Sequence, residues 1–291
     1  MTSAADLRSR AEALAGPLPP LLAEAEHLAS TVLLGAHGRR RSGMGDEFWQ
    51  YRAAMPGDEA RSIDWRRSAR SDAHFVREKE WQAAQSILLW VDAAQSMEFA
   101  SRPDLTSKAD RARLLAMASA ILMIRGGERV ALAALGTPPR SGEVQLMRIA
   151  SALGAGAGAE DYGAPEIRGM LPHSRALFLS DFMGDLAPVE AQMTKAADRG
   201  VRGALVQVLD PQEEAFPFEG RTIFESMGGT LRHETLKAGD LRSRYLDRLA
   251  ARKAALSDLA RATGWQYTCH HTGDSPQAAL LWIYGALERR R

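Results

Sequence analysis

Two aspartates and one serine follow apolar segments of the chain and could together bind a hard metal ion. Asp92 ends the apolar run of residues 87–91, Ser96 comes four positions later, and Asp181 ends the run of residues 175–180. Carboxylate and hydroxyl oxygens are ligands of magnesium, manganese and calcium. The alternative is that both aspartates cap helices or accept hydrogen bonds from loop amides.

The elements that must position these residues alternate between strand and helix patterns. Apolar runs predict strands at residues 87–91, 129–136, 175–181, 203–209 and 265–271. Helical spacing of apolar residues predicts helices at residues 108–125, 143–153, 187–198, 239–263 and 275–288, and a helical appendage within residues 1–34. Strands that alternate with helices predict a doubly wound α/β fold with a mostly parallel sheet, and ligands of such sheets bind at the carboxyl ends of the central strands.

Composition excludes several classes of protein. The net charge of +1 gives no general attraction to nucleic acid, and the single Cys269 excludes an internal disulfide framework or a cysteine-rich zinc site. No apolar run reaches the roughly 18 residues of a membrane span. The partly apolar residues 14–35 are interrupted by prolines and glutamates, a poor pattern for a secretion signal. We therefore expect a cytoplasmic protein without membrane insertion.

An unusual segment, "RRRSGMGDEFWQYRAAMPGDEARSIDWRRSARSDAHFV", precedes the first apolar strand. Residues 35–81 hold ten Arg or Lys against eight Asp or Glu, and nine of the ten cations are arginine. Arginine pairs bidentately with carboxylates, so this balance predicts a self-satisfying network that braces the domain, anchored by Trp65 and Trp81. A partner-facing role for part of the segment is the alternative, and the two are compatible. Nucleic-acid binding through Arg39–Arg41 ranks last, because the segment is nearly neutral.

Two histidines and the cysteine lie on the last predicted strand. Adjacent residues of a strand point to opposite faces, so His270 and His271 cannot easily bind one ion together, and a structural role is expected for both. Cys269 is expected to be an inert, buried residue.

The stretch "VDAAQSM" resembles the metal-ion-dependent adhesion motif of von Willebrand factor A-like domains, Asp-x-Ser-x-Ser. Asp92 and Ser96 match the motif, Asp181 matches its later aspartate by position after a strand, and Ala94 stands where the first serine should be. Alanine supplies no oxygen ligand. The resemblance therefore implies a degenerate site that binds Mg²⁺ weakly at best.

The arginine-rich segment followed by this strand resembles the bacterial domain of unknown function 58 family. The residues of the signature "Y-x-PGD-x-x-R-x-IDW-x-x-SAR" are Pro56, Gly57, Asp58, Arg61, Ile63, Asp64, Trp65, Ser68, Ala69 and Arg70, with Tyr51 at a slightly altered spacing. The resemblance implies a signature segment at residues 35–85, packed beside a von Willebrand factor A-type domain at residues 86–291. Proteins of that family are associated with MoxR-type AAA+ ATPases.

These observations lead to one expected function and one alternative. The expected function is a non-enzymatic protein-binding module, an adaptor or partner of a MoxR-type AAA+ ATPase, whose loops around Asp92, Ser96 and Asp181 face the partner. The alternative is a metal-dependent hydrolase or phosphotransferase that uses Asp92 and Asp181, although no general base or nucleophile is evident in either loop.

Overall fold

The chain forms two compact units, which are described separately. One unit comprises residues 36–85, and the other combines residues 1–35 with residues 86–291. The computed structural model describes residues 19–32, 39–43, 47–55, 58–59, 62–70, 73–156, 158–165, 168–230 and 232–288.

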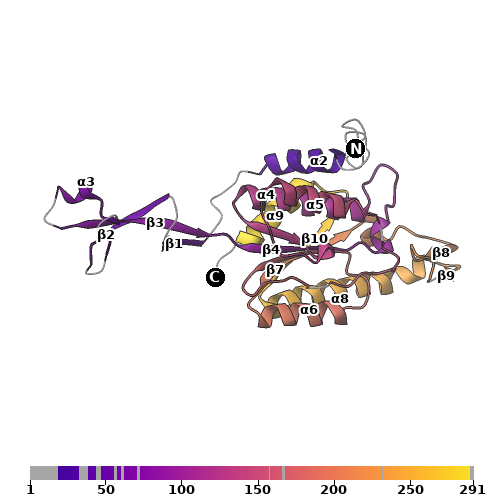
Figure 1. The fold of residues 1–291 in the computed structure, drawn as a ribbon. Helices are drawn as coiled ribbons and strands as arrows, with labels where there is room; N and C mark the ends of the chain where they lie inside the picture. The colour runs from indigo at the N-terminus through magenta and orange to yellow at the C-terminus, as the bar shows by residue number, and fades with distance from the viewer. Residues whose placement is uncertain are drawn as a thin grey trace, which may run out of the picture. The chain divides into compact units, whose positions relative to one another are not determined.

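The larger unit is built on a five-stranded parallel sheet with helices on both faces (Figure 1). In spatial order the strands are β10 (Gln266–His271), β7 (Arg202–Leu209), β6 (Arg175–Ser180), β4 (Ser86–Val91) and β5 (Arg129–Leu132). One face is covered by α4 (Lys108–Arg125), α5 (Glu143–Leu153) and α9 (Pro276–Glu288), and the other by α6 (Ala187–Asp198) and α8 (Gly239–Thr263). A further helix, α2 (Pro19–Ser30), packs against α4 and α9 on the side away from the sheet. The predicted doubly wound α/β architecture is confirmed.

Alternation along β4, an inner strand of the sheet, divides the core into two halves. Leu89 of β4 packs into the cluster beneath α4 and α9, whereas Leu88 and Trp90 pack into the cluster beneath α6 and α8. Trp90 meets Phe178 edge-on, with ring centroids 5.6 Å apart. Because both faces of the sheet are buried, β4 is a continuous apolar run rather than an alternating one.

The strand order creates a crevice at the carboxyl edge of the sheet. β4 lies between β5 and β6, and the chain leaves β4 through α4 and leaves β6 through α6, on opposite faces. Loops that diverge from adjacent strands in this way form the usual ligand site of an open α/β sheet. Asp92 and Asp181 are the first residues after these two strands.

Several short elements near this edge were not predicted. They are the 3₁₀ turns η2 (Gln95–Glu98) and η3 (Ala133–Leu135), the helix α7 (Pro211–Ala215), and the hairpin of β8 (Thr222–Glu225) and β9 (Arg232–Thr235). The predicted strand at residues 129–136 ends at Leu132, because η3 begins there. In Figure 1 the hairpin lies at the far right.

The smaller unit is an antiparallel sheet. Its strands are β1 (Arg39–Gly43), β3 (Phe75–Ala83) and β2 (Glu47–Ala53), in the order β1-β3-β2, and the short helix α3 (Trp65–Ser68) precedes β3. The arginine-rich segment therefore forms a sheet of its own, which the sequence analysis did not predict. That it braces the larger unit stays a prediction.

Local hydrogen bonds explain several residues of the signature. The two terminal nitrogens of Arg52 donate hydrogen bonds to the Asp58 carboxylate at 2.7 and 2.6 Å. These hydrogen bonds lower the pKa of Asp58 to about 2. The buried Ser68 hydroxyl donates to the Asp64 carbonyl and accepts from the Phe75 amide, tying α3 to β3. Arg70 is exposed in the turn after α3. Pro56, Gly57, Arg61 and the Trp81 side chain lie outside the described residues.

Within the smaller unit the Trp65 ring is not buried, and its role as an anchor on the larger unit stays a prediction. Its side chain is 57% exposed and rests edge-on against His74, with ring centroids 5.5 Å apart. Asp64 is the N-cap of α3 instead, since its carboxylate accepts from the Arg67 amide at 3.0 Å and from the Tyr51 hydroxyl at 3.1 Å.

These contacts predict that Asp64→Ala destabilises the smaller unit more than Trp65→Ala does. Loss of an N-cap costs about 1 kcal/mol, whereas truncation of a half-exposed ring on a surface costs less. Hydrogen exchange of the amides of residues 62–76 measures the local effect, with Arg66→Ala as an exposed control on the same helix. Stronger deprotection in Trp65→Ala than in Asp64→Ala would contradict this assignment.

Candidate functional site

Asp92 is buried at the end of β4, and its carboxylate is held by neutral donors. Oδ2 accepts from the Ser180 hydroxyl at 2.6 Å, and Oδ1 accepts from the Ala94 amide at 2.9 Å. Burial raises the pKa of Asp92, and the nearby negative charge of Asp181 adds to the rise. Gly163 crosses so closely that a Cβ there would lie 2.1 Å from Oδ1. Asp92 is thus enclosed by its own loops.

Asp181, at the end of β6, meets a positive charge that the sequence analysis missed. The Lys108 ammonium donates to Asp181 Oδ2 at 2.9 Å and to Glu213 Oε1 at 2.6 Å. The side chains of Lys108 and Asp181 are only 1% and 2% exposed. Lys108 also lies above the Phe99 ring, 5.7 Å from its centroid. These three residues are called the Lys108 triad below: Lys108, Asp181 and Glu213.

Each member of the triad is positioned by a helix end or a turn. Lys108 is the first residue of α4, directly after the N-cap Ser107. Glu213 closes a capping box on α7, because its Oε2 accepts from the Asp210 amide at 2.8 Å. Asp181 Oδ1 accepts from the Met183 amide at 3.0 Å. In both Asp181 and Glu213, therefore, one carboxylate oxygen accepts a hydrogen bond from a backbone amide and the other accepts from Lys108.

The charge on Lys108 depends on its two partners. Burial alone would favour the neutral amine, and the positive end of the α4 dipole disfavours a cation at this position. The negative charges of Asp181 and Glu213 outweigh burial, so the pKa of Lys108 is raised above its ordinary value. Burial also raises the pKa of Glu213, and the lysine opposes that rise.

The arrangement does not fit a divalent cation bound in the manner of the adhesion motif. Ser96 does supply a buried hydroxyl without a hydrogen-bond partner among the described residues. However, Ala94 offers no oxygen, both oxygens of Asp92 accept protein hydrogen bonds, and the Lys108 ammonium sits on the oxygen that Asp181 would offer. The Lys108 ammonium, which pairs with Asp181 and Glu213, supplies a positive charge where such an ion would supply it.

Above the triad lies an open cavity of about 1230 Å³. Ser96, Phe99 and the triad line one part of it. The remaining lining comes from α8, from the β8–β9 hairpin, and from Phe216, Phe218, Asp161, Tyr162, Met183 and Leu186. Four aromatic rings gather there, since Phe216 contacts Phe218, Phe224 and Tyr245 with centroids 4.9–5.7 Å apart. A cavity of this kind, with apolar walls and a few charged groups, is suited to receive a ligand or a segment of another protein.

One face of α8 brings three arginines to the cavity. Arg244, Arg248 and Arg252 follow each other at four-residue spacing and all line it. Arg244 and Arg248 are exposed, and Nη1 of Arg252 is buried without a hydrogen-bond partner within the described part of the chain. The cavity therefore has the ion-paired Lys108 triad on one side and a row of arginine guanidinium groups on α8. Carboxylates of a partner could reach this arginine row.

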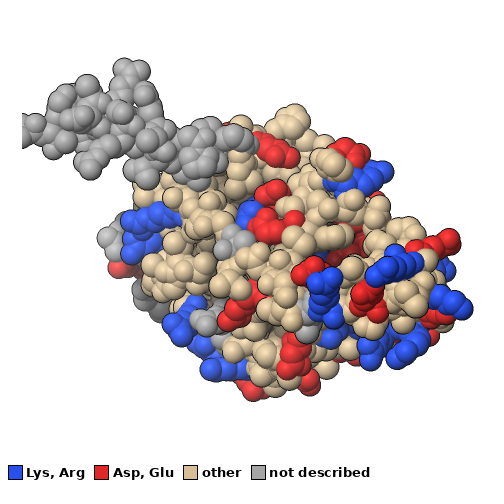
Figure 2. All heavy atoms as spheres, turned by 90° about the vertical axis from the view of Figure 1, so that its right-hand side faces the viewer, with Lys and Arg blue, Asp and Glu red and all other residues tan. Residues whose placement is uncertain are grey.

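The hairpin is fixed over the cavity by Asp161. Its carboxylate accepts from the Ser226 hydroxyl at 3.0 Å, the Gly228 amide at 2.7 Å and the Thr230 hydroxyl. The loop that contains Asp161 is itself joined to η2, where the Ser96 amide donates to the Asp161 carbonyl at 3.0 Å. Figure 2 views the larger unit from the side on which the hairpin lies in Figure 1, and acidic and basic side chains are interspersed there.

The adjacent histidines point to opposite faces, as their strand position predicts. His270 is buried against Arg111 of α4, with Nε2 2.9 Å from the guanidinium, and burial lowers its pKa to about 4. His271 instead contacts Glu214 of α7. Cys269 is partly buried, and burial raises the pKa of its thiol to about 11.

Two residues of the site could have been inferred from the sequence. The pattern Asp210-Pro-x-Glu213 is typical of a capping box, which marks a short helix and the position of Glu213. A lysine at the start of an otherwise largely buried helix is electrostatically unfavourable, which indicates a nearby carboxylate. Which carboxylate it meets depends on the strand order, because Lys108 and Asp181 are 73 residues apart.

Comparison with known proteins gives relatives of unassigned function. The chain is 29% identical over 248 residues to the uncharacterized proteins Mb1516 of Mycobacterium bovis and Rv1480 of Mycobacterium tuberculosis, covering 80% of this chain and 77% of each relative.

Three solved structures align with the chain at low similarity. They are an aerotolerance-related membrane protein from Bacteroides fragilis (10% identity, TM-score 0.40, 70% of this chain and 98% of that one), BatB from Bacteroides thetaiotaomicron (11%, 0.38, 70% and 98%) and an uncharacterized membrane-spanning protein from Vibrio fischeri (16%, 0.21, 71% and 99%).

Two of these three names describe membrane proteins, and the cytoplasmic location expected from the sequence is withdrawn. Among the described residues, no helix is both long and apolar enough to span a bilayer.

A family match covers most of the chain and agrees with the resemblance seen in the sequence. Residues 50–255 match the family described as "Protein of unknown function DUF58", from within the smaller unit to the middle of α8. The chain belongs to the DUF58 family.

Proposed function

We propose that the chain is a non-enzymatic protein-binding module of the von Willebrand factor A type, whose cavity at the carboxyl edge of the sheet receives a segment of a partner protein. The observation that best supports this proposal is the open cavity of about 1230 Å³, which exposes the aromatic rings around Phe216 and the arginine row of α8. The buried Lys108 ammonium, paired with Asp181 and Glu213, lies where the resemblance to A-like domains implies a bound ion.

Because the cation at this position is the Lys108 ammonium and not a bound ion, the contacts with a partner must differ from those of an A-like domain that binds an ion. In A-like domains a carboxylate of the partner can complete the coordination of the bound ion. Lys108 is already paired with two carboxylates and almost inaccessible to solvent. Binding therefore falls to the groups that the cavity exposes, which are the aromatic rings around Phe216 and the arginine row of α8. Aromatic and arginine side chains are the residue types enriched among energetically dominant interface contacts.

The same geometry disfavours the alternative of a metal-dependent hydrolase or phosphotransferase. That mechanism requires an ion shared between Asp92 and Asp181. Lys108 competes for Asp181, and the protein donors on both oxygens of Asp92 would have to be released.

The partner that we propose is a MoxR-type AAA+ ATPase, in keeping with the family resemblance. An adaptor needs a recognition surface and no catalytic group of its own. The cavity offers such a surface, with apolar walls, charged groups and a hairpin fixed by Asp161.

A pull-down with purified components tests the partner. The chain is immobilised and presented with the MoxR-type ATPase of the same organism, in the presence of nucleotide and Mg²⁺. We expect retention of the ATPase by the wild type and by an exposed-surface control, Lys195→Ala on α6. Absence of retention, with both proteins folded, would exclude the adaptor role while leaving the fold assignment intact.

A further inference from the structure

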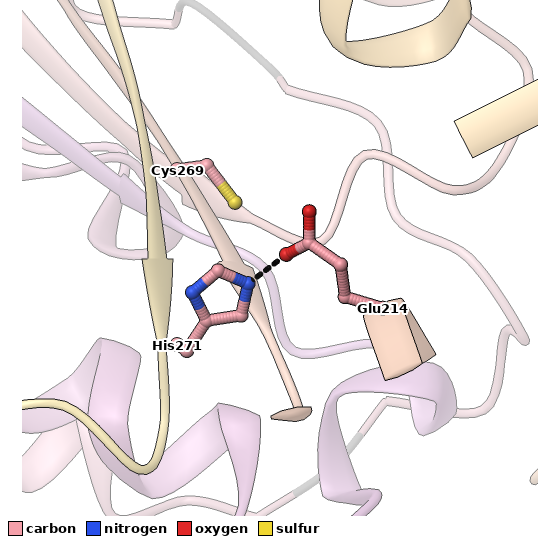
Figure 3. Close-up of side chains that lie close together, drawn as sticks. All are labelled: Glu214, Cys269 and His271. Atoms are coloured by element: carbon pink, nitrogen blue, oxygen red, sulfur yellow. Dashed lines mark hydrogen bonds and ion pairs between the residues drawn. The ribbon is translucent and has the colours of Figure 1, made fainter. Parts of the chain in front are cut away.

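A second cluster of potential metal ligands lies outside the Lys108 triad. Cys269 and His271 are two positions apart on β10, so their side chains project from the same face of the strand. Glu214 approaches them from α7, and one ligand atom of each residue lies within 4.8 Å of the others. Figure 3 shows the thiol, the imidazole and the carboxylate converging.

From this geometry we propose that Glu214, Cys269 and His271 form a binding site for a thiophilic divalent ion, with Zn²⁺ as the expected occupant. A thiolate, an imidazole and a carboxylate are all established zinc ligands, and the thiolate disfavours magnesium and calcium. Three protein ligands would leave the fourth tetrahedral position to water or to a donor from another molecule. This proposal is independent of the function proposed above.

The surroundings of His271 support a ligand role. Its Nδ1 lies 3.5 Å from Asp274 Oδ2, while Nε2 faces Glu214. Metal-binding histidines commonly give one ring nitrogen to a carboxylate, which orients the other toward the ion. The residues of the cluster are partly accessible, since Glu214 is exposed and the other two are half-buried. An ion can therefore enter without unfolding the strand.

Lys253 of α8 is the group that competes with the ion. Its ammonium pairs with Oε1 of Glu214, leaving Oε2 toward His271. Zinc ligands lie 2.0–2.3 Å from the ion. Because His271 Nε2 and Glu214 Oε2 are in direct contact, an ion must separate these two atoms and draw the Cys269 thiol toward them. Removing the Lys253 charge should free the Glu214 carboxylate for that rearrangement, and Lys253→Ala is expected to bind the ion more tightly than the wild type.

Titration of the full-length chain, free of any affinity tag, with Co²⁺ tests the proposal. Co²⁺ substitutes for Zn²⁺ and gives an absorption band from thiolate-to-metal charge transfer, which Zn²⁺ should abolish by displacement. We expect the band in the wild type and its loss in Cys269→Ser. His271→Gln and Glu214→Gln should each weaken binding at least about 10-fold. His27→Gln, an exposed histidine of α2, is the matched control and should bind like the wild type.

Circular dichroism without metal shows whether each variant is folded. If Cys269→Ser fails to fold, the other two ligand variants decide the question. No charge-transfer band in the folded wild type would overturn the proposal. Binding of Co²⁺ with wild-type affinity in both His271→Gln and Glu214→Gln would also overturn it. In either case the cluster is an ion-pair network of Glu214 with Lys253 and His271.

Discussion

Lys108→Met will lower the stability of the larger unit by about 3–5 kcal/mol, because it leaves two carboxylates buried without their cation. Methionine has a similar length and no charge, so the packing around Phe99 is retained while Asp181 and Glu213 repel each other. For a unit of this size, the melting temperature should fall by about 10 °C. Thermal melts followed by circular dichroism measure the change, and Lys195→Met on the exposed side of α6 should melt like the wild type.

A second substitution separates charge from packing. Adding Glu213→Gln to Lys108→Met removes one of the two unpaired charges, while the amide oxygen can still accept the Asp210 hydrogen bond. The double variant should therefore recover part of the lost stability. If the free energy of unfolding of Lys108→Met lies within about 0.5 kcal/mol of the wild-type value, the triad is not a stabilising ion cluster.

The pH dependence of the same variant has a defined sign. In the wild type the pKa of Lys108 is raised, so its contribution is fully present below the unfolded pKa of about 10.4 and is lost as the pH rises through the folded value. In Lys108→Met the pKa of Glu213, which burial raises, loses the opposing charge of the lysine, so the variant should become more stable relative to the wild type as the pH is lowered toward 5.

Charge reversal on α8 should have the largest effect on partner binding. Arg248→Glu places a negative charge in the middle of the arginine row that lines the cavity. If a partner segment carries carboxylates to this row, we expect the affinity for the MoxR-type ATPase to fall at least about 10-fold, equivalent to about 1.4 kcal/mol. Biolayer interferometry with immobilised chain measures this loss.

Arg261→Glu is the matched control for this reversal. It changes the same charge on the same helix, but Arg261 is exposed near the end of α8 and does not line the cavity. Equal weakening by both variants would indicate a general effect of charge. Unchanged binding in Arg248→Glu would place the interface elsewhere.

The fold was largely predictable because its signals are local. β4 and β6 are buried on both faces, which produces uninterrupted apolar runs such as residues 87–90, and Asp92 and Asp181 follow those runs directly. The β8–β9 hairpin gave no such signal, since its short strands are half exposed and contain few apolar residues. Trp65 was expected to be buried because its ring is large and apolar, whereas within the smaller unit the ring lies against His74 and is 57% exposed.

The candidate site was less predictable because its central contact is not local. Asp92, Ser96 and Asp181 could be placed at the carboxyl edge of the sheet from their motif, but nothing in the motif brings Lys108 from the start of α4 or Glu213 from α7 to that edge. That required the order of the strands and the direction of their connections. As a result, the positive charge beside Asp181 and Glu213 comes from Lys108 and not from the metal ion that the motif suggested.

The measurement that tests this account most directly is the affinity of the chain for the MoxR-type ATPase with and without divalent ions. Biolayer interferometry is run with nucleotide-free ATPase, first in Mg²⁺ and then in EDTA, so that chelation acts on the binding site and not on nucleotide. Because the proposed binding groups are the aromatic rings around Phe216 and the arginine row of α8, and not a bound ion, we predict dissociation constants that agree within about twofold. A loss of more than about tenfold in EDTA, restored by Mg²⁺ and absent in Asp92→Ala, would contradict the account and identify a functional metal site.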